Sequence, residues 1–134
     1  MDEDCHQIAN FAAVPKADYR WAISPDANSI ALVNNQTPTI DLLHLDGRPA
    51  RKVTVQGQRN FDWLFWAPDG KGFYVSTQGE DRSLLLYVDL HGSVRSVWEE
   101  AGGLGTRGIP SPDGKHIALQ SWTLATNLWM MENF

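Results

Sequence analysis

The segment SPDGKHIALQS, from Ser111 to Ser121, joins a turn to a short apolar run, and two close copies of it occur earlier in the chain. SPDANSIALVN begins at Ser24, and APDGKGFYVST begins at Ala67. In each copy proline restricts the backbone of the turn, aspartate can cap it, and glycine tolerates a positive φ. One such turn is a local event, but three copies at even spacing predict a repeated architecture.

The spacing of the turn prolines predicts the size of the repeating unit. Pro25, Pro68 and Pro112 are 43 and 44 residues apart. One extended run precedes each turn and a second follows it. A third run comes after a polar stretch, and the first two units carry a fourth. β-branched and aromatic residues dominate these runs, and no helical period extends beyond a turn or two. We therefore predict an all-β fold of four-stranded antiparallel units.

Four-stranded units of about 43 residues are typical of β-propeller blades. We expect three blades in the chain, at about 18–57, 60–101 and 105–134, with the third blade lacking its own outer strand. A closing outer strand is expected at about 5–11. Three blades cannot close a ring, and an open wedge would expose apolar faces. We therefore expect a homodimer that completes a six-bladed β-propeller, in which each copy lends its N-terminal strand to the other.

The repeat also resembles a known family. The SPDG turn with its following IA pair, together with LYVDLHG (residues 86–92), resembles the blade repeat of TolB-type, WD-like propellers. The resemblance covers Asp18 to Phe134. It departs from the family where a tryptophan is expected two residues before the turn proline, because only Trp66 fits and the other copies have Ile23 and Pro110.

The resemblance implies a function as well as a fold. It suggests the C-terminal half of a six-bladed propeller from a bacterial sensor or kinase-associated protein. Such a module would recognise a protein, peptide or ligand and would not be an enzyme. Two alternatives remain open at this point: an accessory propeller that gates a prolyl-oligopeptidase-like hydrolase, and an excised or designed fragment with no activity of its own.

The composition of the chain limits the classes of partner that we expect and leaves its cellular compartment open. The net charge is −5 with an isoelectric point near 5.2, and no cluster of lysine and arginine occurs. Nucleic acid and anionic membranes are therefore not expected as partners. No apolar run approaches the roughly 18 residues of a membrane span, and the acidic N-terminus does not resemble a signal peptide. The compartment stays open between bacterial cytoplasm and periplasm, since the single cysteine, Cys5, does not decide it.

Motifs for chemistry are weak. GLGTRG (residues 103–108) fits a dinucleotide fingerprint, but it joins two predicted strands, whereas phosphate binding requires a following helix. The four histidines lack the spacing of a metal-ligand pair. The motif aspartates recur once per unit, which favours a role in the turns. We therefore predict no catalytic, cofactor or metal residues.

The remaining candidates are defined by position in the repeat. Arg20, Trp63 and Arg107 each lie five residues before a turn proline, and Asp62 is adjacent to Trp63. These positions belong to the innermost strands, at the mouth of the expected channel. The two arginines would suit an acidic peptide or a small anion. The alternative is that they pair with carboxylates of neighbouring blades or pack against tryptophans.

Overall fold

The computed structural model describes residues 19–58, 60–123 and 130. This part of the chain contains ten strands and no helix, so none of its elements is a helix able to cross a membrane. All strand pairs are antiparallel, which confirms the all-β prediction. The strands are β1 (Tyr19–Ile23), β2 (Ser29–Asn34), β3 (Thr39–His44), β4 (Arg51–Thr54), β5 (Phe61–Trp66), β6 (Gly72–Gln78), β7 (Arg82–Asp89), β8 (Val94–Ala101), β9 (Gly103–Pro110) and β10 (Ile117–Thr123).

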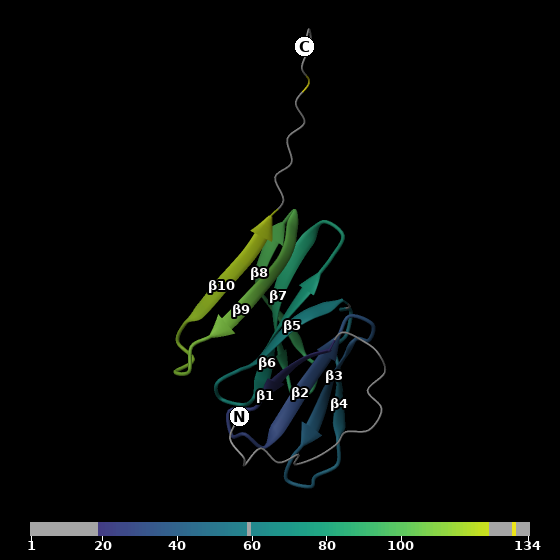
Figure 1. Ribbon diagram of the computed structural model, residues 1–134, viewed down its shortest axis with the longest axis vertical. Coiled ribbons are helices and arrows are strands. Elements are labelled where there is room, and N and C mark those ends of the chain that lie inside the picture. The colour runs from purple at the N-terminus through teal and green to yellow at the C-terminus, as the bar shows by residue number, and fades with distance from the viewer. Residues whose placement is uncertain (1–18, 59, 124–129, 131–134) are drawn as a thin grey trace, which may run out of the picture.

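The strands form three separate sheets, each made of consecutive strands (Figure 1). The first sheet is β1–β4, the second is β5–β8, and the third contains β9 and β10. No sheet of the described residues closes into a propeller, so the expected six-bladed β-propeller is not confirmed. The strand expected at 5–11 and the third run of the last unit, at 128–133, fall outside the strands that the structure describes.

The three repeated turns share one hydrogen-bond pattern. The backbone N–H of the first turn residue (Ser24, Ala67 or Ser111) donates over 2.8 Å to the carbonyl five residues later. Each motif aspartate accepts the N–H two residues later, at 2.9 to 3.1 Å. The hydroxyl of Ser24, 2.5 Å from Asp26, lowers the pKa of that carboxyl. The aspartates therefore stabilise the turns, as their spacing predicts.

The residue after each motif aspartate has a left-handed backbone. Gly70 and Gly114 have φ values of 70° and 71°, and the equivalent Ala27 has a φ of 59°. Glycine adopts this conformation without steric cost, whereas alanine carries a Cβ that approaches the following carbonyl. The first turn is thus the strained copy of the three.

Replacing Ala27 with glycine should relieve that strain. We expect Ala27→Gly to raise the free energy of unfolding by about 1 kcal/mol, measured by urea denaturation. Gly70→Ala is the matched reverse change, because a Cβ at Gly70 meets no atom within 4 Å and so adds backbone strain alone. It should lower stability by about the same amount. Equal stability of both variants and the wild type would contradict this account of the turns.

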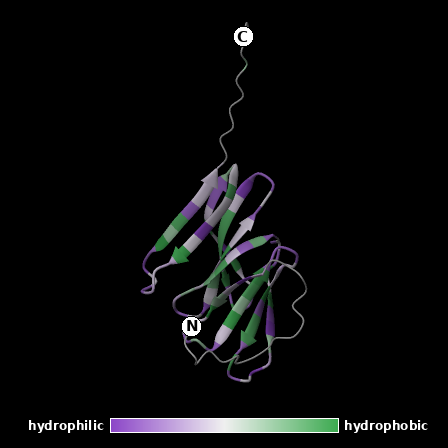
Figure 2. Ribbon diagram, viewed as in Figure 1, coloured by the Kyte–Doolittle hydropathy of each residue, from purple (hydrophilic) through white to green (hydrophobic). Residues whose placement is uncertain are grey.

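The core lies between the first and second sheets. Figure 2 shows that hydrophobic residues concentrate in the strands and hydrophilic residues in the turns. Alternate side chains of a strand point to opposite faces, so each sheet can offer one face to its neighbour. The first sheet contributes Ala31, Val33, Ile40, Leu42, Val53 and the adjoining Val55, and the second contributes Phe61, Leu64, Phe73, Val75, Leu86 and Val88.

The opposite face of the second sheet is covered by the third. Leu85 is buried there, and a Cβ atom added at Gly108 of β9 would overlap its side chain. The hydroxyls of Ser83 and Thr106 lie 2.8 Å apart and are buried between β7 and β9. Glycine at position 108 therefore permits close approach of the two sheets, and the hydroxyl pair satisfies the polar groups that this approach buries.

Breaking the hydroxyl pair tests the packing of the second and third sheets. Thr106→Val should lower the free energy of unfolding by about 1–3 kcal/mol, because it leaves the buried Ser83 hydroxyl without its partner. The double variant Ser83→Ala, Thr106→Val removes both polar groups and should lose less than Thr106→Val alone. A double variant that loses the sum of the two single changes would show that the hydroxyls are not coupled.

Candidate functional site

The first strands of the three sheets lie next to one another. β5 contacts β1 on one side and β9 on the other. Arg20 lies on β1, Trp63 on β5 and Arg107 on β9, so all three sheets contribute a side chain to one region. Repetition of the unit produces this arrangement, because each residue holds the same position before its turn proline.

The three side chains stack. The guanidinium carbon of Arg107 lies 3.6 Å from the ring centre of Trp63, and that of Arg20 lies 5.4 Å from it. Arg107 also lies 4.8 Å from the ring centre of Trp122 on β10. These are cation–π distances, at which the negative ring face attracts the guanidinium. We call Arg20, Trp63, Arg107 and Trp122 the arginine–tryptophan cluster.

Three nitrogen atoms of the cluster are buried without an acceptor. Nε of Arg20, Nε1 of Trp63 and Nε of Arg107 have no hydrogen-bond partner within the described part of the chain. Neither arginine forms an ion pair there. A buried donor without an acceptor costs roughly 1–3 kcal/mol, so such groups are rare unless something else satisfies them. Within the described residues, the cluster therefore combines two guanidinium groups that form no ion pair with three buried donors that have no acceptor.

Asp62 lies at the edge of the cluster. Its side chain is partly buried and faces a separate cavity of about 320 Å³ that also contacts Asn35 and Asn60. Within the described residues it forms no ion pair with the cluster arginines. The structure thus brings together three of the four residues singled out by position, and Asp62 lies beside them without a described ion pair to either arginine.

Position in the repeat did not identify Trp122. The residues at equivalent places in the earlier units are Gln78 and Asn35, so no pattern marks an aromatic residue there. The glycine-rich segment supplies the only local signal. Trp122 packs beside Gly105, where an added Cβ would lie 3.2 Å from the indole ring. GLGTRG is expected from the sequence to join two strands, but it lies within strand β9, where Gly105 gives the indole ring room.

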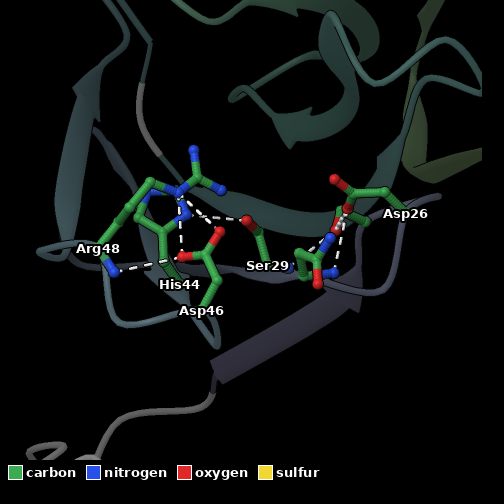
Figure 3. Close-up of polar contacts among 7 residues, drawn as sticks. Asp26, Ser29, His44, Asp46 and Arg48 are labelled. Atoms are coloured by element: carbon green, nitrogen blue, oxygen red, sulfur yellow. Dashed lines mark hydrogen bonds and ion pairs between the residues drawn. The ribbon is translucent and has the colours of Figure 1, made fainter.

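A second polar region lines a cleft of about 720 Å³ between the first and second sheets (Figure 3). The hydroxyl of Ser29 and Nδ1 of His44 lie 2.8 Å apart. Asp46 pairs with Arg48 at 2.8 Å, which lowers the pKa of the Asp46 carboxyl. Ser29 and His44 thus satisfy each other, as do Asp46 and Arg48, so these side chains already have polar partners. No group of three or more potential metal-ligating side chains occurs among the described residues.

Comparison with solved structures places the fold. The chain is similar to a candidate 6-phosphogluconolactonase of Bacteroides fragilis, with a TM-score of 0.54 and 20% identity over 81% of this chain. A second candidate 6-phosphogluconolactonase, of Bacteroides uniformis, gives a TM-score of 0.49 and 19% identity over 76% of this chain. The chain spans about a third (33%) of the length of each. No protein-family model and no curated protein matches the sequence.

The comparison corrects three expectations. The TolB-type, WD-like resemblance, with its bacterial sensor or kinase-associated context, is wrong, since the matched Bacteroides fragilis structure is described as a candidate lactonase and the sheets do not close into a propeller. The descriptions of the chain as a TolB-like or WD40-like repeat protein depend on this resemblance and are wrong for the same reason. The expectation that the protein is not an enzyme is also wrong as it stands, because the fold is shared with a protein described as one. At 20% identity this likeness establishes the fold alone.

Proposed function

We propose that the chain is a ligand-recognition module and that its arginine–tryptophan cluster binds a small anion. The single observation that carries this proposal is that three stacked neighbours, Arg20, Trp63 and Arg107, each bury an N–H donor that has no acceptor among the described residues. All three donors are N–H groups, and two belong to guanidinium groups that always carry charge. An anionic oxygen ligand would satisfy both the charge and the hydrogen bonds.

Phosphate and carboxylate are the ligands that this chemistry suits best. Guanidinium groups bind both through short, charge-assisted hydrogen bonds. Trp63 is only half-buried, so the part of its indole that the arginines leave uncovered adds an apolar surface that a sugar ring can contact. The name of the Bacteroides fragilis protein refers to a phosphorylated sugar lactone. We therefore propose a phosphorylated sugar acid as the ligand class of this chain.

The arrangement of the sheets suggests where this ligand binds. We propose that the three sheets are consecutive blades of a propeller-like ring whose first strands, β1, β5 and β9, face a central channel. The near-constant spacing of the repeat and the packing of each sheet on the next support this proposal. In such a ring the cluster occupies the channel mouth and the ligand enters along the channel axis.

Calorimetric titration at low salt tests anion binding directly. We expect 6-phosphogluconate to bind with a Kd below about 1 mM, and inorganic phosphate to bind more weakly because it lacks the sugar contacts. Arg107→Gln should weaken binding by about tenfold or more, because it removes a charge-assisted contact.

The matched control is Arg95→Gln. Arg95 also stacks on an aromatic ring, that of Tyr87 at 5.4 Å, but lies on β8, outside the cluster. This variant should bind both anions as the wild type does. An Arg107→Gln variant that retains wild-type affinity, or a wild type that binds neither anion, would show that the cluster only holds the sheets together.

A further inference from the structure

We propose that the outer face of the first sheet is a docking surface for the third sheet of a second copy of this chain. The inference rests on the proposed arrangement of the sheets as consecutive blades. Two large apolar side chains of β1 are prominent on this face: Trp21 is 64% exposed and Ile23 is 52% exposed. Exposure of an indole and a branched aliphatic chain side by side is unusual for a surface that stays in water.

The repeat shows what these positions do when they are covered. Trp21 and Ile23 correspond to Leu64 and Trp66, which lie 43 residues later on β5. Leu64 is buried in the core against the first sheet. Trp66 packs on the same core, and its indole N–H donates to the carbonyl of Ala22 over 3.0 Å. In the second sheet these positions are covered by a neighbouring sheet. We therefore infer that Trp21 and Ile23 of the first sheet are covered by another sheet as well.

The second strands repeat this correspondence. Cross-strand pairs join Trp21 to Leu32 and Ile23 to Ile30 in the first sheet. Leu64 to Val75 and Trp66 to Phe73 are the matching pairs of the second sheet. Phe73 and Val75 are completely buried between the two sheets. The outer face of the first sheet thus has the same strand register and apolar character as the face of the second sheet that packs against the first.

The third sheet carries the complementary surface. The pair of first-sheet residues Ala22 and Ala31 packs toward the second sheet. The residues 87 positions later are Ile109 and Ala118, which are cross-strand neighbours on β9 and β10. Ile109 is 46% exposed. The third sheet therefore offers an uncovered apolar pair at the place from which the first sheet covers the second.

One chain cannot bring these two faces together. The second sheet lies between the first and the third, which sit at opposite ends of the stack in Figure 1. A second copy can place its third sheet on the first sheet of its partner, and the partner can do the same in return. This head-to-tail contact satisfies both faces in each copy when it closes after two steps. Two copies are the smallest assembly that leaves neither face exposed.

Light scattering and sedimentation of the full chain test the assembly. We expect a species of twice the 15.0 kDa of one chain. Trp21→Glu and Ile109→Glu each place a charge in the proposed contact and should weaken association on the order of 100-fold. Both side chains are already exposed in the single chain, so the variants should fold, which circular dichroism can check.

Mixing the two variants separates this contact from other modes of association. The mixture contains one unaltered first sheet and one unaltered third sheet, so it should form a dimer although neither variant does so alone. Trp98→Glu is the matched control, because Trp98 is 43% exposed but lies on the second sheet. It should remain a dimer.

Three results would overturn the proposal. A wild-type monomer at all concentrations would exclude the second copy and leave a preceding sheet of a longer chain as the occupant. Disruption by Trp21→Glu but not by Ile109→Glu would indicate that two first sheets pack together. Assemblies that grow without limit would exclude closure by two copies. Titration of Trp21→Glu with 6-phosphogluconate separates these failures from failure of the anion site, which this variant leaves intact.

Discussion

The structure depends on one packing constraint: the second sheet is apolar or closely packed on both faces, so it needs a neighbour on each side. Phe73 and Val88 are fully buried toward the first sheet. Leu85 and Ser83 are buried on the other face, where the third sheet approaches them through Gly108 and Thr106. A four-stranded sheet of this kind cannot bury both faces alone, so the unit is stable only as part of a stack.

The candidate site is a consequence of that stacking. Because each sheet packs on the next in chain order, the first strands of the sheets come together and residues at one repeat position meet. Arg20, Trp63 and Arg107 converge in this way. The stack supplies attraction between the rings and the guanidinium groups, but it leaves three N–H donors buried without an acceptor in the described part of the chain. This combination of stacking and free donors is the basis of the proposed anion site.

The repeated turn predicted much of the fold because its residues act locally. The turn motif fixed the places of β2, β6 and β10, and the runs around it predicted the remaining strands. Equivalent position in the repeat also indicated that Arg20, Trp63 and Arg107 would lie in the same region, on the first strands of the three units. It could not reveal Trp122, which has no aromatic equivalent in the other units, or that Asp62 forms no described ion pair with the arginines, which depends on packing between sheets. The family resemblance failed because a turn-and-strand phrase reports architecture and carries little information about activity.

Nuclear magnetic resonance of the Arg107 side chain tests the central claim most directly, namely that three sheets pack so that both arginines stack on Trp63. At 3.6 Å from the ring centre, the guanidinium and the adjoining methylene protons lie in the shielding region of the indole. We predict strongly upfield-shifted Arg107 side-chain resonances, with cross-relaxation to Trp63 and Trp122 ring protons. Arg107 resonances at the positions of a free arginine, without cross-relaxation to either ring, would contradict the account.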